Sequence, residues 1–312
     1  MKALIPSGGA GTRLRPITYT SAKQLVPIAN VPILSYVLED VADAGIADVI
    51  IVVGDTAEEI KSYVGSGAHW GLNVAYVQQD APRGIAHTML ISRELLGDDP
   101  FVVYLGDNML RDGIVSLTDA YRASPVAAQI LVAKVPDPRQ YGVVEMDGDR
   151  VVRLVEKPDS PASDLALAGV YVFDASVHDA VAALHPSARG ELEITEAIQA
   201  LLDQGATVRA LPVEGWWKDT GRVEDLLEAN QLVLAGENVV DPSARVSGSK
   251  IGPNTAVGPG CVVEDSDIEN SIVMEGCVIR GSSVRDSLLG RGVEIEGVAG
   301  TFVVGDHGRV RA

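Results

Sequence analysis

The stretch at residues 7–27 of this 312-residue chain reads SGGAGTRLRPITYTSAKQLVP. An apolar run at residues 3–5 precedes it, and helical spacing of apolar residues resumes only after Pro32. This order predicts a strand, a glycine-rich loop and a helix, in which backbone N–H groups can approach an anion closely. The loop lacks the Gly-Lys-Ser/Thr ending of a P-loop, and its third glycine comes too early for a dinucleotide fingerprint.

Two cations, Arg13 and Lys23, follow the glycines within the same polar segment. A glycine cradle with two cations suits a triphosphate, whose charge must be neutralised while a phosphorus atom is attacked. A turn with a purely structural role is the alternative for such a loop. The residues predicted to bind the nucleotide here are Gly8, Gly9, Gly11, Thr12, Arg13 and Lys23.

The same residues carry a family resemblance. Residues 8–16 read Gly-Gly-x-Gly-Thr-Arg-Leu-x-Pro and residues 23–27 read Lys-Gln-Leu-x-Pro, which resembles the signature of the sugar-1-phosphate nucleotidylyltransferases. The likeness extends from residue 1 to about residue 234, and it is greatest to members that use dTTP and carry a repeat tail. It implies a Mg²⁺-dependent enzyme that transfers a dTMP group from dTTP to α-D-glucose 1-phosphate.

Composition excludes several other classes of protein. The formal net charge of −18 argues against non-specific binding to nucleic acid. Hydrophobic residues make up 46% of the chain, yet no apolar run approaches the length of a membrane span. The N-terminal apolar run is too short for a signal peptide, and two cysteines, Cys261 and Cys277, suit a reducing compartment without disulfides. We therefore expect a cytoplasmic enzyme that concentrates its cations at the site.

Strand and helix patterns alternate along residues 1–236, which predicts one catalytic domain. Alternation implies a mostly parallel sheet with helices on both faces, a doubly wound, Rossmann-like mixed α/β sheet. Strand-like runs with proline-rich turns at residues 127–173 indicate a mixed insert over the active-site cleft. Strands are expected at residues 3–5, 49–53, 74–77, 101–105 and 208–213, and helices at residues 33–41, 57–64, 85–96, 177–184, 194–202 and 223–234.

The pattern changes abruptly after residue 236. Aliphatic residues then recur every four to six positions with glycine, asparagine and small residues between them, as in Ile-Gly-Pro-Asn-Thr-Ala at residues 251–256. This degenerate hexapeptide repeat predicts a short left-handed parallel β-helix over residues 237–300, and an ordinary β-rich tail is the alternative. Residues 301–312 show no periodicity and are expected to form a tail, in which residues 302–304 could add one strand. Because the repeats bear no candidate catalytic group, we expect them to serve subunit contact in a homo-oligomer, or stability.

Two aspartates are candidate metal ligands. Asp107 follows the buried run at residues 101–105, and ligands of open α/β sheets lie at the carboxyl ends of strands. Asp219 lies in Trp-Trp-Lys-Asp-Thr-Gly just before the last predicted helix, where the tryptophans are expected to pack rather than to touch ligands. Read alone, each aspartate is typical of a turn or a helix start. The resemblance makes them ligands of one Mg²⁺, which prefers few carboxylates with phosphate oxygens and water.

The resemblance also assigns a sugar-phosphate site. Glu156 and Lys157, in Val-Glu-Lys-Pro, would accept sugar hydroxyls and neutralise the phosphate, respectively. Gly142, in Tyr-Gly-Val, matches another sugar contact. Related short-form enzymes have Asn-Tyr-Ala-Val-Thr-Gly where this chain has Asp-Leu-Ala-Leu-Ala-Gly, which places Leu167 at a sugar-contact position. This departure leaves the choice of sugar open.

Base recognition is implied for two glutamines that match the family, Gln24 and Gln79, with Gly84 permitting close approach. A glutamine can pair bidentately with an amide edge, and thymine and uracil share that edge. The sequence therefore leaves the choice between dTTP and UTP open.

The attacking phosphate is already ionised, so the predicted reaction needs no general base. The resemblance then gives catalytic roles to Arg13 on the leaving pyrophosphate, to Lys23 on the phosphates near the reacting centre and to Lys157 on the attacking phosphate. The alternatives are a UTP-dependent or other sugar-1-phosphate nucleotidylyltransferase, a non-catalytic regulatory subunit of the same fold, and an added acetyltransferase activity in the repeats. The retained charged residues argue against the subunit, and the single tail histidine, His307, argues against the acetyltransferase.

Overall fold

The computed structural model describes residues 1–312, which form two compact units. The first unit contains Met1–Gly9 and Val37–Asp219, and the second contains Ala10–Tyr36 and Thr220–Ala312. None of the helices combines the length and the apolar character needed to span a bilayer. The compact units do not follow the predicted boundary at residue 236, because the signature loop groups with the C-terminal part of the chain.

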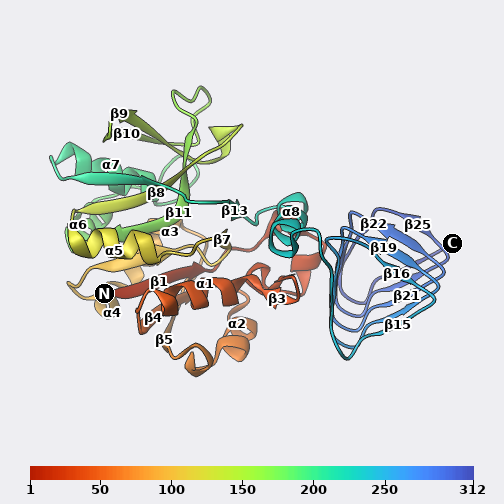
Figure 1. The fold of residues 1–312 in the computed structure, drawn as a ribbon. Helices are drawn as coiled ribbons and strands as arrows, with labels where there is room; N and C mark the ends of the chain where they lie inside the picture. The colour runs from red at the N-terminus through yellow and green to blue at the C-terminus, as the bar shows by residue number, and fades with distance from the viewer. The chain divides into compact units, whose positions relative to one another are not determined.

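The first unit is built on a nine-stranded mixed sheet (Figure 1). Its central strand β1 (Lys2–Ser7) pairs in parallel with β4 (Asp48–Val53) on one side and β6 (Phe101–Tyr104) on the other. These strands are apolar on both faces, as expected of central strands that helices cover on each side. The path runs β10-β9-β11-β6-β1-β4-β5, with β8 paired to β11 and β12 paired to β8. The remaining strands are β5 (Asn73–Gln78), β8 (Ala128–Lys134), β9 (Gly142–Asp147), β10 (Arg150–Glu156), β11 (Leu165–Phe173) and β12 (Val208–Pro212).

Helices cover both faces of this sheet, which confirms the doubly wound arrangement. Side chains alternate between faces along a strand, and Phe101 and Val103 of β6 pack with helices α3, α6 and α7 in one core. On the opposite face the Tyr104 hydroxyl donates a hydrogen bond to Asp40 of α1, at 2.7 Å. The helices are α1 (Ile33–Asp43), α2 (Ala57–Val64), α3 (Ile85–Ile91), α4 (Arg93–Leu96), α5 (Val115–Ala123), α6 (Val177–Ala182), α7 (Ile194–Asp203) and α8 (Val223–Leu234).

The segment at residues 127–173, which was expected to form a mixed insert over the active-site cleft, instead supplies four of the nine strands of the main sheet. Its strand β11 pairs antiparallel with β6, with Tyr171 opposite Val103, and also pairs with β8 and β9. Antiparallel pairing lets consecutive strands join through tight turns, which explains the proline-rich turns that set this segment apart in the sequence.

The repeats form a parallel β-helix with three faces of short strands, consistent with the left-handed form that was predicted (Figure 1). Ile272 pairs with Leu288 one coil later, sixteen positions along the chain. The first face contains β14 (Val239–Val240), β17 (Ala256–Val257), β20 (Ile272–Val273), β23 (Leu288–Leu289) and β26 (Val303–Val304). The second contains β15 (Arg245–Ser247), β18 (Val262–Glu264), β21 (Val278–Arg280), β24 (Glu294–Glu296) and β27 (Arg309–Arg311). The third contains β16 (Lys250–Ile251), β19 (Asp267–Glu269), β22 (Ser283–Arg285) and β25 (Ala299–Gly300).

Residues 301–312, which were expected to form a tail, carry the last two strands of the β-helix. Leu288 of β23 pairs with Val303, and Ile295 of β24 pairs with Val310. Phe302, Val304 and Val310 pack against the β-helix core. The strand that the sequence allowed at residues 302–304 is therefore present as β26, whereas β27 was not expected.

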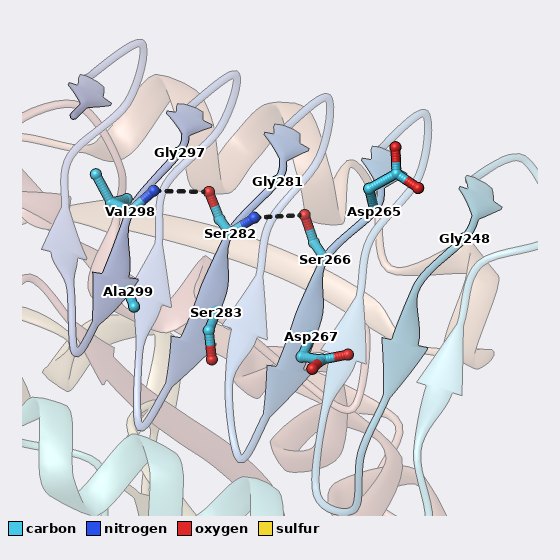
Figure 2. Close-up of a pocket in the computed structure, with 10 residues that line it drawn as sticks. All are labelled: Gly248, Asp265, Ser266, Asp267, Gly281, Ser282, Ser283, Gly297, Val298 and Ala299. Carbon is cyan, nitrogen blue, oxygen red and sulfur yellow. Dashed lines mark hydrogen bonds between the residues drawn. The ribbon is translucent and has the colours of Figure 1, made fainter.

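Serines stack at one corner of the β-helix and satisfy the backbone between coils. Figure 2 shows the Ser266 hydroxyl accepting a hydrogen bond from the Ser282 N–H, and the Ser282 hydroxyl accepting one from the Val298 N–H. Each hydroxyl donates in turn to a carbonyl of its own coil. Buried backbone groups at the corner thus keep hydrogen-bond partners where no strand ladder can supply them.

Candidate active site

In the first unit, predicted nucleotide-binding residues meet where β1 and β4 end. A β-carbon added to Gly8 would lie 3.1 Å from Oε1 of Gln79 and 3.4 Å from the backbone nitrogen of Gly54. A β-carbon on Gly54 would in turn lie 2.5 Å from the carbonyl oxygen of Gly8. The two turns therefore approach so closely that position 54 has space only for glycine, and a side chain at position 8 would have to displace Gln79. Gln79 N–H bonds the Val53 carbonyl at 2.8 Å, which fixes this glutamine beside the loop.

A histidine orients the Gln79 side chain. The Gln79 amide nitrogen lies 2.9 Å from Nδ1 of His87, and both side chains are buried. Burial, helped by the positive charge of Arg83, lowers the pKa of His87, so that the neutral ring can accept this hydrogen bond. The amide oxygen is then the end of Gln79 that faces Gly8.

Gly84 is required by the fold itself. Its φ of 95° lies in the region that favours glycine, and an added β-carbon would collide with the backbone of Leu192. Leu192 N–H bonds the Arg83 carbonyl at 2.7 Å and the Ala86 N–H bonds the Leu192 carbonyl at 3.1 Å. The absent side chain of Gly84 makes room for the chain at Leu192, and its role in the approach of the nucleotide stays a prediction.

The two candidate metal ligands come from strands that pair with each other. In an antiparallel ladder, Asp219 of β13 (Trp217–Asp219) lies opposite Asn108 of β7 (Asn108–Leu110). Asp107 directly precedes β7, so the ladder brings the two carboxylates from distant parts of the chain to neighbouring positions. An added β-carbon on Gly106 would strike the Ser7 hydroxyl, which places the Asp107 turn against the end of β1.

Asn108 is a partner that sequence reasoning missed. Its amide nitrogen donates to Oδ1 of Asp107 at 3.2 Å, and its amide oxygen accepts a 2.6 Å hydrogen bond from the Trp217 indole. Trp217 also packs at an angle against Tyr141, with ring centroids 5.5 Å apart. Because Trp217 can only donate, it fixes which end of the Asn108 amide faces Asp107. The tryptophans were expected only to pack, but Trp217 also orients the Asn108 amide through a hydrogen bond.

The donor set fits Mg²⁺ better than a transition metal. No cluster of three or more His, Cys, Asp or Glu side chains suitable for a metal ion exists in the chain. Two carboxylates at neighbouring register positions, Asp107 and Asp219, leave the rest of an octahedron to phosphate oxygens and water. This is the arrangement that Mg²⁺ adopts with nucleotide substrates.

The structure brings together all four predicted sugar-phosphate residues. Gly142 and Glu156 are directly paired on β9 and β10. A β-carbon on Gly142 would lie 3.3 Å from Oε2 of Glu156 and 2.8 Å from Cδ1 of Leu167, and would collide with Thr195. Thr195, which was not predicted, donates its hydroxyl to Oε2 of Glu156 at 3.2 Å. Gly142 thus lies at the centre of a tight cluster.

Arg189 is a second residue that the sequence reasoning missed. Its guanidinium lies 3.0 Å from Oε1 of Glu156, 2.8 Å from Oε2 of Glu193 and 3.4 Å from Glu191. Burial raises the pKa of Glu196, and the charges of Glu193 and Glu156 add to the rise. A single arginine therefore balances a strongly acidic cluster and holds Glu156 in place.

Lys157 has an unusual backbone conformation. Its φ is 41°, which non-glycine residues rarely adopt, and its N–H bonds the Tyr141 carbonyl at 3.0 Å. The ammonium lies 3.5 Å from Oε1 of Glu156, and the side chain is partly exposed. Backbone strain of this kind occurs where a side chain must point in a direction that the regular strand would not give it.

The rest of the signature loop belongs to the second unit. Gly11 has a φ of 57°, and its carbonyl accepts hydrogen bonds from the Thr18 hydroxyl at 2.7 Å and the Leu14 N–H at 2.9 Å. Thr12 and Arg13, in the 3₁₀ turn Thr12–Leu14, are exposed.

The turn Lys23–Leu25 differs from the exposed part of the loop, because Lys23 and Gln24 are only 7% and 2% exposed. The buried Oε1 of Gln24 has no hydrogen-bond partner within the chain. An acceptor held in this way is suited to a ligand that can donate to it.

The predicted site residues therefore fall into two groups. The first unit gathers Gly8, Gly9, Gln79, Gly84, Asp107, Gly142, Glu156, Lys157, Leu167 and Asp219, and the second contains Gly11, Thr12, Arg13, Lys23 and Gln24. Among the missed residues, Arg189 had a signal, since it is a cation two positions before the acidic segment at residues 191–196.

A groove of about 450 Å³ on the β-helix is separate from these residues. It is lined by the serine corner together with Asp265 and Asp267 (Figure 2). Its inward serines are engaged with neighbouring coils, and it contains no cation that could hold a phosphate.

Comparison with known proteins agrees with both parts of the chain. The nucleotidyl transferase family model matches residues 2–236, and the GMPPB C-terminal domain matches residues 234–311. A glucose-1-phosphate thymidylyltransferase of Streptomyces griseus is 48% identical over 309 residues, which cover 88% of this chain and 87% of the relative.

Two solved structures share the fold of most of the chain. A glucose-1-phosphate thymidylyltransferase from Bacillus anthracis has a TM-score of 0.70 at 34% identity, covering 74% of this chain and 94% of that one. UDP-glucose pyrophosphorylase in complex with UDP-glucose has a TM-score of 0.68 at 26% identity, covering 74% and 97%. The chain belongs to the nucleotidyl transferase family, and its likeness to the glucose-1-phosphate thymidylyltransferases extends over most of its length.

Proposed function

We propose that the chain transfers a dTMP group from dTTP to α-D-glucose 1-phosphate, giving dTDP-glucose and pyrophosphate. The observation that carries the proposal is the 48% identity to the Streptomyces griseus glucose-1-phosphate thymidylyltransferase, over 309 residues. In the reaction, a phosphate oxygen of the sugar phosphate attacks the α-phosphorus of dTTP. The bond from that phosphorus to the bridging oxygen breaks in line, and pyrophosphate leaves with the bond's electron pair.

The protein's contribution to this reaction is positioning and charge stabilisation. Arg13 holds the leaving pyrophosphate, Lys23 contacts the phosphates near the reacting centre, and Lys157 orients the attacking phosphate. The exposed position of Arg13 and the unusual backbone of Lys157 support these roles. Gln24 and Gln79 read the pyrimidine amide edge, which the ordered Gln79–His87 pair supports.

The sugar site is the cluster around Gly142. Its Glu156 carboxylate accepts sugar hydroxyls, and Arg189 and Thr195 keep that carboxylate in one orientation. Leu167, which stands where the short-form enzymes have valine, presents an apolar surface to the sugar.

Asp107 and Asp219 would hold the Mg²⁺ ion of the family. When bound, the ion supplies positive charge to the phosphates as they react. The chain's own contribution is to orient the carboxylates, through the Asn108 amide on Asp107 and the strand ladder under Asp219.

A pyrophosphate-release screen tests the proposal. Purified protein is assayed with dTTP, UTP, CTP, ATP and GTP against a panel of sugar 1-phosphates. We expect the highest turnover with dTTP and glucose 1-phosphate, with ATP and GTP far poorer because a purine would not fit a pyrimidine-sized site. Equal turnover with a purine triphosphate would contradict the base assignment. No release with any pair would favour the regulatory subunit, and the predicted homo-oligomer is tested separately by light scattering.

A second candidate is the same transfer from UTP. The likeness to UDP-glucose pyrophosphorylase, at a TM-score of 0.68, is the observation that favours it. Thymine differs from uracil by one methyl group, which is worth only about tenfold to 200-fold in an apolar pocket. The ratio of kcat/KM for dTTP and UTP in the same screen decides between the two.

A further inference from the structure

The signature loop and the β-helix are joined by a set of specific contacts within the second unit. The Thr20 hydroxyl donates to Oδ2 of Asp306 at 2.8 Å, and the buried Ser21 hydroxyl donates to the same oxygen at 3.3 Å. Asp306 lies in the turn between β26 and β27, in the last coil. A carboxylate that accepts two hydroxyls from a distant loop is a stronger link than two neutral partners would form.

Asp306 is also fixed by contacts within the β-helix. Its Oδ1 accepts a 2.7 Å hydrogen bond from the Arg291 N–H of the preceding coil. A β-carbon on Gly290 would lie 2.5 Å from the same Oδ1, so this turn has space only for glycine. One carboxylate oxygen therefore bonds to the β-helix and the other to the loop.

Residues 16–30 contact the C-terminal part of the second unit at three further places. A β-carbon on Gly305 would lie 3.0 Å from the Pro16 carbonyl oxygen, so the backbones are close there. At the far end, the Ala29 N–H bonds Oδ1 of the fully buried Asn230 at 2.8 Å, and the Asn30 amide bonds the Val257 carbonyl at 2.9 Å. Ala29 and Asn30 both have positive φ, a conformation that the surrounding contacts must maintain.

The turn Lys23–Leu25 lies between these anchors, with Thr20 and Ser21 before it and Ala29 and Asn30 after it. We propose that the β-helix forms part of the nucleotide site by fixing this loop, and that Asp306 is the positioning residue that holds Lys23 and Gln24 for dTTP. The inference rests on the proposed function for the identity of the nucleotide. It goes beyond the expected role of the repeats in subunit contact or stability.

The test compares the variants Asp306→Ala, Asp306→Asn, Thr20→Val and the pair Thr20→Val/Asp306→Ala in the full-length protein. The control is Asp241→Ala, because Asp241 bonds the Ser243 N–H and hydroxyl in the first coil, a similar carboxylate contact within the β-helix. Steady-state kinetics give KM separately for dTTP and glucose 1-phosphate. Hydrogen exchange over residues 16–30 gives a second readout that does not depend on turnover.

We expect Asp306→Ala to raise KM for dTTP about tenfold, the effect of losing a charge-assisted hydrogen bond, with KM for glucose 1-phosphate unchanged. The double variant should be no worse than Asp306→Ala. Asp306→Asn should restore KM in part, because its amide oxygen can accept from the Arg291 N–H and its NH2 group can donate to the loop hydroxyls, but the charge is lost. Exchange over residues 16–30 should accelerate in Asp306→Ala and not in the control.

A lower kcat with both KM values unchanged would mean a purely structural role and would overturn the proposal. Unchanged exchange over residues 16–30 would overturn it as well. If the wild-type protein shows no turnover, the proposed function fails, and the exchange result still decides whether Asp306 positions the loop.

Discussion

Replacing Asp40 by asparagine should stabilise the protein at neutral pH and have little effect in acid. Asp40 lies on α1, and its Oδ2 accepts a 2.7 Å hydrogen bond from the Tyr104 hydroxyl. Burial raises the pKa of Asp40 from 3.8 to about 7, and the hydrogen bond from Tyr104 only partly offsets this rise. The charges of Asp43 and Glu39 add to it. Tyr104 is completely buried and its own pKa is raised by that burial, so it keeps its proton.

The direction of the pH effect follows from the protonation of Asp40 in the folded and in the unfolded chain. Below pH 3.8 the carboxyl is protonated in both the folded and the unfolded chain. As the pH rises toward 7, the unfolded chain loses this proton first, so the free energy of unfolding falls until the folded pKa has been passed. A shift of this size corresponds to about 4 kcal/mol at pH 8, since each pKa unit is worth about 1.4 kcal/mol. Asparagine cannot ionise, yet its oxygen can still accept from Tyr104.

Unfolding midpoints in urea for the wild type and Asp40→Asn, measured from pH 4.5 to 8 at constant ionic strength, check this expectation. The variant should gain stability over the wild type steadily across that range and level off above pH 7. Glu94→Gln is the control, because Glu94 is an exposed carboxylate of the same unit that is not among the charges acting on Asp40, and its curve should be nearly parallel to that of the wild type. A difference between wild type and Asp40→Asn that stays constant with pH would refute the reasoning.

Three further predictions concern the site. Asp107→Asn and Asp219→Asn should each lower kcat by about 10²–10³-fold, and the double variant should be little worse, because both residues act through one ion. Full turnover of either single variant at low Mg²⁺ would remove that residue from the metal site. Trp217→Phe should lower kcat about tenfold by releasing the amide that orients the first aspartate, whereas Trp216→Phe should not, and equal rates would contradict this. The neutral ring of His87 accepts from the adjacent glutamine, so KM for dTTP should rise as the pH falls through the lowered pKa of His87. This rise of KM in acid should be absent in His87→Leu. The same rise in the wild type and in His87→Leu would count against a role for His87.

The elements that the sequence predicted well are those whose pattern is local. Residues 57–64 and 223–234 carry apolar residues at helical spacing, and both form helices over those bounds. The helix expected at residues 85–96 instead divides into α3 and α4 at Ser92, where no glycine or proline marks a break. The Ser92 N–H bonds the Met89 carbonyl three positions back, and Leu96 of α4 packs in the same core as Met89 of α3. That division depends on tertiary packing, which periodicity does not report.

Contacts between distant segments explain most of what the sequence could not predict about the site. The motif residues were identifiable by type and order, and Glu156 and Leu167, which were predicted to bind the sugar phosphate, lie together at Gly142. The hydrogen-bond partners of the site residues could not be identified from the sequence. The Trp217–Asn108 bond joins residues 109 positions apart, and the Thr20–Asp306 bond joins residues 286 positions apart. An aspartate in a repeat tail carries no local sign that it serves a loop at the other end of the chain.

The spacing of the loop anchors has a consequence for the evolution of the β-helix. One anchor, Val257, lies on β17, and the other, Asp306, follows β26, three coils further along the stack. Parallel strands stack at about 4.8 Å, so the anchors are separated along the stack by about 14 Å, a length that residues 20–30 must match. Solenoids ordinarily gain or lose whole repeats at little cost, because each coil contacts only its neighbours. Here the loss of one coil would move Asp306 out of hydrogen-bond reach of Thr20, so the loop restricts the number of coils that the protein can carry.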